Sequence, residues 1–206
     1  KALAEEACEI EMDILKKPMG KQDQYLAVYG GFTVLEISRD GNVSVRRANV
    51  NSSTIEDLKR NLVMFYTGQK RENKQILGSQ SKSTEKGEKK VIESLHYIKE
   101  SGYKILEIVE KGNITDLGIM FDKHWQYKKR MANGISNKHI DTIYQEAKNN
   151  GAIGGKISGA GGGGFFFFLA PPNKHQQIRG ALSQIKVWVP FKIDNTGSQV
   201  IFYNGN

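Results

Sequence analysis

A glycine-rich stretch constrains this chain more than any other feature. Residues 151–164 hold eight glycines in fourteen positions. Glycine has no Cβ and loses more conformational entropy on folding than any other residue, so a packed element rarely tolerates such a run. The stretch is expected where the backbone must approach another group closely or adopt positive φ. We therefore predict a loop that leads directly into a strand over residues 165–169, whose sequence is Phe-Phe-Phe-Phe-Leu.

Two known phosphate-binding motifs do not account for this loop. A Walker loop needs Gly-x4-Gly-Lys-Ser/Thr, but Asn150 stands at its first position and Ile157 follows the lysine. The spacing Gly159-x-Gly161-x-x-Gly164 matches the dinucleotide fingerprint, which opens a helix, whereas this loop runs into a strand. Successive backbone N–H groups still form anion-binding concavities. We predict a phosphate-facing loop; the flanking strand and helix patterns disfavour the alternative, a flexible linker.

Charge and composition narrow the possible partners. The 206 residues include 30 Lys and Arg against 22 Asp and Glu, a net charge of +8. This excess favours an anionic partner, either nucleic acid, a membrane surface or a small phosphorylated ligand. No apolar run reaches the roughly 18 residues of a membrane helix, and the N-terminus lacks a signal-peptide pattern, so we expect a cytoplasmic protein. A single cysteine, Cys8, excludes an internal disulfide and a cysteine-based zinc site.

Hydrophobic periodicity predicts the remaining elements. Leu3, Ala7, Ile10 and Ile14 form one helical stripe that Pro18 ends. Several helices followed by a strand, a helix and two strands indicate an α+β fold. We predict a hairpin over 32–46, strands over 26–29, 62–66, 165–169, 187–191 and 199–202, exposed helix within 72–104, and helices over 105–110, 114–131, 137–149 and 174–184.

Two carboxylates are candidates for chemistry. In an extended run, Lys21 would share a face with Asp23 and hold it ionised. An ionised aspartate accepts or orients the proton of a hydroxyl in phosphoryl transfer; a turn aspartate satisfied by backbone N–H groups is the alternative. Glu11 falls on the side of its helix that carries Ala4 and Cys8, where a divalent metal would offset its desolvation.

Two cations, Arg71 and Lys128, stand near the ends of predicted elements, and a plain surface charge is the alternative for each. The four histidines lack ligand spacing, which disfavours a zinc site. His124, beside Trp125, is expected to pack in the core or in a cleft.

Several motifs resemble one family. Residues 156–164, Lys-Ile-Ser-Gly-Ala-Gly-Gly-Gly-Gly, resemble the third motif of the GHMP kinases, the superfamily of galactokinase, homoserine kinase, mevalonate kinase and phosphomevalonate kinase. Residues 20–24, Gly-Lys-Gln-Asp-Gln, resemble the segment with their catalytic aspartate. The bacterial D-glycero-D-manno-heptose 7-phosphate kinases are the most similar subgroup. That similarity rests on residues 21–31, 65–71, 124–128 and 135–141, in one consistent order over almost the whole chain.

The resemblance implies a two-domain GHMP kinase fold. Residues 1–55 would be the remainder of the N-terminal domain, and residues 56–206 the complete C-terminal α/β domain with an antiparallel sheet. The implied reaction transfers the γ-phosphoryl of ATP to the anomeric hydroxyl of D-glycero-D-manno-heptose 7-phosphate, for the synthesis of nucleotide-activated heptose. ATP and Mg²⁺ are the implied cofactors, and the partners are small molecules rather than membranes or nucleic acid.

Other functions stay open at this point. The first alternative keeps the superfamily but changes the acceptor to another sugar, such as fucose or galactose, because fold-level kinship does not fix the acceptor. A non-catalytic sugar- or nucleotide-binding relative is a second alternative, which the presence of Asp23 disfavours. A nucleic-acid binder is the last, and the chain has no recognised module for that role.

The resemblance also assigns residues. Asp23 would be the base or the orienter of the sugar hydroxyl, and Glu11, seven residues before Pro18, would help to hold Mg²⁺. Arg71 and Lys128 are inferred from their charge to grip the sugar phosphate. The remaining implied contacts are Lys21, Tyr29 and Gly30 for the substrate, and Gly159, Ala160, Gly161, Gly162 and Gly163 for the phosphates.

The family's N-terminal motif and its glycine- and serine-rich ATP loop do not occur in these 206 residues. We therefore expect the C-terminal two-thirds of a longer kinase, which needs its missing N-terminal part and is nearly inactive alone.

Overall fold

The computed structural model describes residues 1–70 and 73–202. The chain divides into two compact units. The first is Lys1–Asn49 together with the C-terminal segment from Lys192, and the second is Val50–Phe191. Each unit has its own hydrophobic core.

The first unit packs two helical segments and a hairpin. Its core consists of Ala4, Cys8, Tyr25 and Val43. The hairpin strands are antiparallel, as the alternating pattern predicts. The elements are α1 (Ala2–Cys8), which continues into the π-helical turn η1 (Glu9–Ile14), α2 (Gln22–Tyr29), β1 (Thr33–Ile37) and β2 (Val43–Arg47).

The first helix buries a different stripe from the predicted one. Ala4 and Cys8 are buried, whereas Leu3, Ile10 and Ile14 are 53%, 45% and 65% exposed. A second apolar stripe with period four runs through Ala4 and Cys8, and their small side chains let the helix pack closely with Tyr25. Hydrophobicity alone could not select between the two stripes.

Residues 26–29, predicted as a strand, belong to α2. A short apolar run has the same pattern in a strand and in a buried helix, so periodicity does not separate them. The helix ends at Gly30, whose φ of +61° favours glycine.

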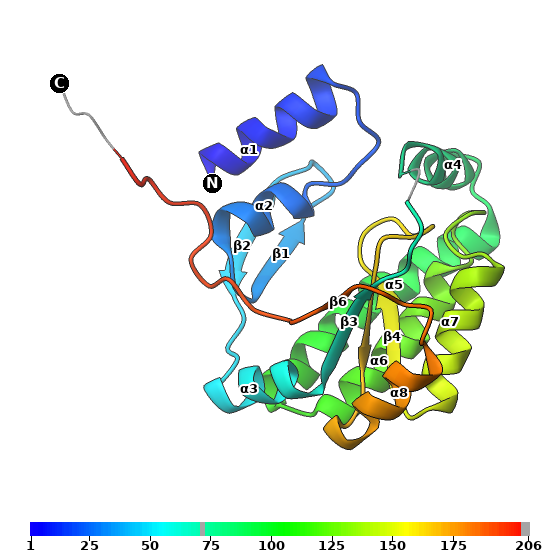
Figure 1. Ribbon diagram of the computed structural model, residues 1–206. Helices are drawn as coiled ribbons and strands as arrows, with labels where there is room; N and C mark the ends of the chain where they lie inside the picture. Colours follow the sequence, from blue (N-terminus) through cyan, green and yellow to red (C-terminus); the bar gives the residue numbers. More distant parts are fainter. Residues whose placement is uncertain (71–72, 203–206) are drawn as a thin grey trace. The chain divides into compact units, whose positions relative to one another are not determined.

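The second unit is built on a four-stranded antiparallel sheet with the order β4-β5-β3-β6. Helices α5 and α6 pack against each other, and α6 packs on β4 and β5 (Figure 1). The predicted α+β class with antiparallel sheets is therefore confirmed. The strands are β3 (Leu62–Tyr66), β4 (Gly154–Ile157), β5 (Phe165–Leu169) and β6 (Trp188–Val189). The helices are α3 (Ser52–Asn61), α4 (Asn73–Glu85), α5 (Lys89–Lys111), α6 (Ile114–Lys128), α7 (Lys138–Asn149), the short 3₁₀ helix η2 (Pro172–Lys174) and α8 (His175–Ala181).

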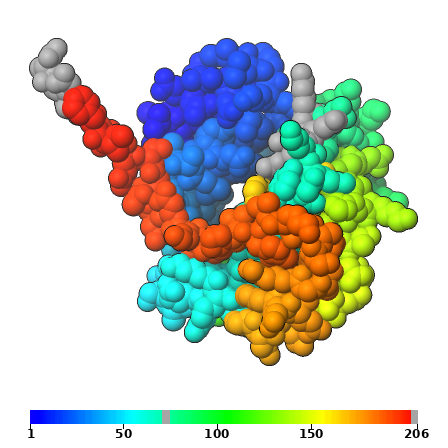
Figure 2. Space-filling model, viewed as in Figure 1, coloured from blue at the N-terminus to red at the C-terminus, as the bar shows by residue number. Residues whose placement is uncertain are grey.

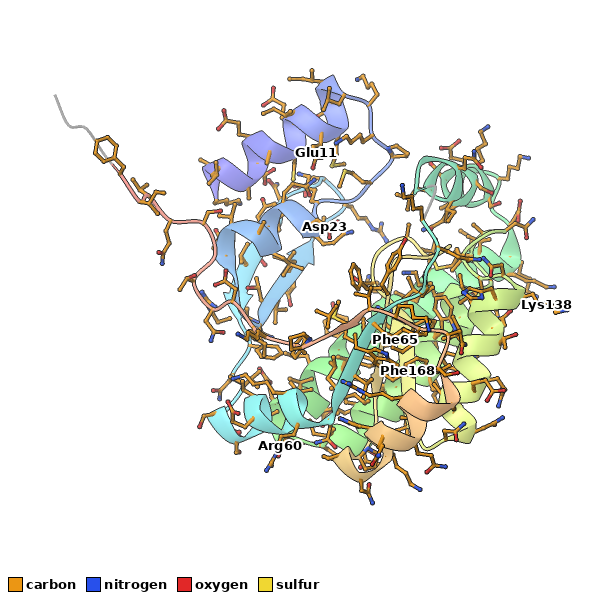
Figure 3. The ribbon with its side chains drawn as sticks, viewed as in Figure 1. Glu11, Asp23, Arg60, Phe65, Lys138 and Phe168 are labelled. Atoms are coloured by element: carbon orange, nitrogen blue, oxygen red, sulfur yellow. The ribbon has the colours of Figure 1, made fainter. Side chains whose placement is uncertain are left out.

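The phenylalanine run supplies the core of this unit. Alternation along β5 buries Phe166 and Phe168 completely, whereas Phe165 and Phe167 stay half-buried. Phe65 of β3 stacks on Phe166 and Phe168 with ring centroids 6.1 and 6.0 Å apart. Figure 3 labels Phe65 and Phe168. Residues from α7, α8 and the C-cap of α8 also belong to the cluster: Ile140, Ile143, Tyr144, Ala147, Ile178 and Leu182.

The C-terminal segment differs from the prediction. Residues 199–202 form no strand, and Val200, Ile201 and Phe202 are 82%, 96% and 80% exposed, on an extended end (Figure 2). Their β-propensity does not suffice, because none of the strands in the described chain pairs with them. The residues before them contact the first unit, where Gly31 N donates to Asp194 O at 2.6 Å. The domain predicted over residues 56–206 includes these residues, and its bounds stay a prediction.

The helical predictions need one change. The expected helix over 105–110 is the last part of α5, which runs without a break from Lys89 to Lys111. The N-cap of α7 is confirmed, since Asn137 Oδ1 accepts from Ile140 N at 3.0 Å.

The glycine-rich stretch begins as a strand and not as a loop. In β4, a Cβ on Gly154 would lie 2.1 Å from Gly118 O, and a Cβ on Gly155 would lie 2.4 Å from Phe167 O. Glycine at these positions lets α6 and β5 approach the backbone of β4. Close packing therefore explains why glycine occupies these two positions of the stretch.

Gly155→Ala is expected to destabilise the protein by about 1–3 kcal/mol, because the new methyl group overlaps the β5 backbone. Gly102→Ala is the matched control: it lies within α5 with open space around its Cα and should stabilise by about 0.5–1 kcal/mol. Urea unfolding followed by the fluorescence of Trp125 and Trp188 measures both. Equal effects of the two substitutions would contradict the packing role.

Candidate active site

The loop of residues 158–164 follows β4 and has a fixed conformation. Gly162 N donates to Ile135 O and Gly164 N donates to Gln69 O, both at 2.9 Å. The loop is thus anchored to two distant segments, which rules out a free linker. Positive φ occurs at Gly159 (+82°), Gly161 (+111°), Gly162 (+75°), Gly163 (+146°) and Gly164 (+87°).

Packing restricts the second part of the loop to glycine. A Cβ on Gly161 would lie 2.8 Å from Ile135 Cγ2, and one on Gly163 would lie 2.6 Å from Gln69 O. The first part is different. Within the described residues, the backbone N–H groups of Gly159 and Ala160 have no hydrogen-bond acceptor. These two amides, like those of Gly161 and Gly163, are available for an anion.

The other motif segments meet at this loop. Thr67 N donates to Gly164 O at 2.9 Å, and Asn137 Nδ2 donates to Gln69 Oε1 at 3.0 Å. His139 Nε2 lies 2.9 Å from Thr67 O. Segments from β3, from the turn before α7 and from the loop therefore form one surface. Arg71, predicted to grip a phosphate, lies outside the described residues.

Lys128 is the last residue of α6, and its Nζ donates to Gly159 O. The contact places an ammonium group beside the unused amides of the loop. This location is compatible with the predicted contact to the sugar phosphate, which stays a prediction.

Sequence reasoning assigned no chemical role to two residues beside Lys128, although both belong to recognised segments. Lys156 is half-buried in β4, where burial and then the charge of Lys128 lower the pKa of its ammonium to about 7. His124, one turn before Lys128, has its pKa lowered to about 3 by burial, then by Lys156 and Lys128. Its Nδ1 is buried, with no hydrogen-bond partner in the described chain. The signal that could have indicated Lys156 is the presence of a charged residue between Gly155 and Ile157, which are both buried.

Asp23 lies in the first turn of α2 in the first unit and is exposed. The predicted pair with Lys21 is wrong, because residues two apart on a helix point to different sides. Lys21 Nζ instead contacts Glu5 Oε2 at 3.2 Å and Gly41 O at 3.0 Å. Among the described residues the Asp23 carboxylate makes no hydrogen bond or ion pair, so its oxygens are accessible to a ligand.

Glu11 is paired, as its half-buried position requires. Lys17 Nζ donates to Oε1 at 2.6 Å and Gln24 Nε2 to Oε2 at 2.5 Å, and these contacts, Lys17 first, lower the pKa of the carboxyl. Because Gln24 follows Asp23, the two candidate carboxylates come from neighbouring parts of η1 and α2 (Figure 3).

The described residues do not fit a magnesium site in this arrangement. Both Glu11 oxygens are engaged, and no group of three His, Cys, Asp or Glu side chains occurs in the described part of the chain. A hard divalent ion needs several oxygen ligands, which one engaged carboxylate does not supply.

Tyr29 and Gly30 have structural contacts of their own. The Tyr29 ring stacks on Tyr25 with centroids 6.2 Å apart. A Cβ on Gly30 would lie 2.5 Å from Gly197 N, so the C-terminal segment needs glycine there. Arg47 donates to the carbonyl oxygens of Tyr29 and Gly30, at 2.8 and 3.1 Å. Their substrate contacts stay predictions.

Comparison with known families identifies the second unit. Residues 105–186 match the family "GHMP kinases C terminal". The chain carries a GHMP kinase C-terminal domain. The match spans α6, α7, the glycine loop and β5, so Lys128, Lys156 and the loop lie within this domain, whereas Thr67, Gln69 and Asp23 lie outside the matched residues. No helix in the described residues is both long and apolar enough to cross a membrane.

Relatives of the GHMP kinase domain extend the match to most of the chain. The D-glycero-alpha-D-manno-heptose 7-phosphate kinase of Campylobacter jejuni is 34% identical over 187 residues, 91% of this chain and 55% of the relative. The structure of a putative sugar kinase from Campylobacter jejuni has a TM-score of 0.70 and is 31% identical in sequence. The match covers 94% of this chain and 55% of that protein. A D-glycero-D-manno-heptose 1-phosphate kinase from Bacteroides thetaiotaomicron has a TM-score of 0.68 and is 26% identical in sequence. The match covers 94% of this chain and 52% of that protein. This chain thus spans about half the length of these proteins.

The pKa of Lys156 predicts how stability depends on pH. The folded value of about 7 lies below the ordinary value of 10.5, so between them the unfolded chain holds a proton that the folded chain has released. Stability must therefore rise from pH 7 upward. Lys156→Met removes this dependence and should stabilise the protein at pH 6 by about 1–3 kcal/mol.

Urea unfolding at pH 6 and pH 9 tests this. Lys123→Met, an exposed lysine of the same helix as Lys128, is the control and should behave as wild type. An unchanged pH dependence in Lys156→Met would show that the charge of Lys156 is not desolvated.

Proposed function

We propose that this chain is the C-terminal part of an ATP-dependent sugar kinase that phosphorylates the anomeric hydroxyl of D-glycero-D-manno-heptose 7-phosphate. The observation that carries the proposal is the meeting of three motif segments at one anchored glycine loop, which holds amides available for an anion. The 34% identity to a heptose 7-phosphate kinase supports this acceptor over fucose or galactose.

Asp23 is the proposed catalytic residue. Its exposed carboxylate accepts or orients the proton of the anomeric hydroxyl, whose oxygen attacks the γ-phosphorus of ATP. The bond from the γ-phosphorus to the bridging oxygen breaks, and ADP leaves. The Gly159 and Ala160 amides face phosphate oxygens of ATP, where fixed donors stabilise charge that develops in the transition state. Lys128 binds the phosphate that the sugar already carries.

Two parts of the reaction depend on groups beyond these residues. A longer polypeptide is proposed to supply the loop that cradles the ATP phosphates. Glu11 would bind Mg²⁺ only if the ion replaced Lys17 and Gln24 as the partners of its two carboxylate oxygens. No step of the reaction is therefore assigned to Glu11. Arg71 is retained as a proposed second cation for the sugar phosphate. The kinase is proposed to act on small molecules in the cytoplasm.

Asp23→Asn in the intact kinase should lower turnover on the order of 10²-fold or more, because the amide cannot accept the proton. ATP affinity should change little. A coupled assay of ADP release and a direct ATP titration measure the two quantities. Asp13→Asn, also exposed in the first unit, is the control and should keep wild-type turnover. Undiminished turnover of Asp23→Asn would refute its assignment.

Lys128→Met should raise the KM for heptose 7-phosphate by about tenfold or more, since it removes a charge-assisted contact to the phosphate. The unphosphorylated heptose should be affected far less. Steady-state kinetics with both acceptors make the comparison. A similar loss with both would show that Lys128 acts only by holding Gly159.

A further inference from the structure

Residues 194–198, here called the C-terminal clamp, cap the end of α2. The last carbonyl oxygens of an α-helix have no partner within the helix and need donors from elsewhere. Ser198 Oγ donates to Ala27 O at 3.2 Å, and Ser198 N donates to Val28 O at 3.1 Å. Ser198 and Ala27 are 171 residues apart in the sequence, so this cap does not arise from the local sequence of the helix.

Arg47 of β2 supplies the donors for the next two carbonyl oxygens. Its guanidinium group donates to Tyr29 O at 2.8 Å and to Gly30 O at 3.1 Å. Arg47 Nη2 also donates to Asn195 O at 3.2 Å, so one side chain joins the end of α2 to the C-terminal clamp. A cation at this end is also favourable because the C-terminus of a helix carries partial negative charge.

Glycines allow these groups to approach the end of α2. Gly197 has a φ of +67°, and a Cβ at this position would lie 2.3 Å from Val28 O. A Cβ on Gly31 would lie 2.2 Å from Arg47 Nη1. Any larger residue at position 197 therefore has to move the clamp away from the helix.

The clamp has a defined conformation of its own. Asp194 Oδ1 accepts from Thr196 N at 2.8 Å and from Thr196 Oγ1 at 2.6 Å. These bonds, that of the Thr196 side chain first, lower the pKa of the Asp194 carboxyl. Gly31 N donates to Asp194 O at 2.6 Å, and Figure 1 shows the segment passing the end of α2. A turn formed in this way loses less conformational entropy when it docks.

Packing alone holds α2 with few buried side chains. Tyr25 belongs to the buried core of the first unit, whereas Val28 and Tyr29 pack against that core and are only partly buried. A segment with few buried apolar contacts opens at a low cost in free energy. The bonds at the end of the helix therefore contribute a large part of what fixes it in place.

We propose that the C-terminal clamp and Arg47 position Asp23 for proton transfer. The inference rests on the proposed function for the identity of the reaction. Asp23 lies in the first turn of α2, which has eight residues and therefore about two turns. The clamp touches the other end of this short helix, so it acts on Asp23 through the helix and contacts no reacting atom.

Removal of the clamp tests this role. The intact kinase truncated after Phe191 keeps all the proposed site residues. Its kcat should fall by about tenfold or more, because a small displacement of a reacting group costs much of the rate. The KM for ATP should change little. An unaltered kcat after truncation would overturn the proposal.

Rescue in trans separates positioning from a general loss of stability. A synthetic peptide of residues 192–206, added at up to about 1 mM because the covalent link is lost, should restore turnover saturably. The same peptide with Gly197→Ala should not, because its new Cβ overlaps Val28 O. Equal rescue by both peptides would contradict the proposed docking.

Point variants of the full chain keep the proposal testable if the truncated protein does not fold. Gly197→Ala should lower kcat by about tenfold or more. It should also speed hydrogen exchange of the amides of residues 26–31 by about tenfold or more. Gly87→Ala is the matched control: its φ of +66° gives the same backbone strain, with no atom within 4 Å of the new Cβ.

The control should exchange these amides and turn over as wild type does. Equal changes in Gly197→Ala and Gly87→Ala would contradict a specific role of the clamp. Hydrogen exchange requires no turnover, so the two proposals fail separately. A protein whose clamp protects α2 but which phosphorylates no sugar refutes the kinase proposal alone. A heptose 7-phosphate kinase with the same kcat in wild type and Gly197→Ala refutes the positioning proposal alone.

Discussion

The close contact of the glycine backbone with its neighbours is the constraint on which the second unit depends. Gly154 and Gly155 let α6 and β5 approach β4, and Gly161 and Gly163 let the loop lie against Ile135 and Gln69. These contacts bring segments from β3, α6 and the start of α7 to one place. The composition that first indicated a phosphate loop thus has two causes. Most of the glycines serve packing, and among the described residues the amides of Gly159, Ala160, Gly161 and Gly163 have no acceptor and remain for a ligand.

Much of the second unit follows from its sequence because its signals are local and consistent. The phenylalanine run alternates as a buried strand must, and Asn137 caps α7 with the expected hydrogen bond. Prediction was wrong where one pattern fits two structures. The apolar residues 26–29 suit a strand or a helix, and β-branched residues near the C-terminus suit a strand only if another strand pairs with them.

The residues of the candidate site could be predicted from the sequence where a motif points to their role. They could not be predicted where burial in the folded protein alters the pKa of a side chain. Asp23 and the glycine loop come from recognisable segments, although the helix at Asp23 removes the expected contact with Lys21. Lys156 and His124 lie within recognised segments, but no motif predicts their chemistry. Their altered pKa values arise because the fold packs them beside Lys128 in a partly desolvated place, a juxtaposition of residues that are distant in sequence.

The central claim is that this chain is part of an ATP-dependent kinase that acts on a phosphorylated heptose. The most direct test is a coupled ADP-release screen of the intact protein with ATP and heptose 7-phosphate, fucose or galactose. The account predicts turnover with heptose 7-phosphate that exceeds the other two acceptors by about 10²-fold or more in kcat/KM, as expected when a site built for a polar group rejects ligands without it. Equal turnover with fucose or galactose, or ADP release that no sugar stimulates, would contradict it.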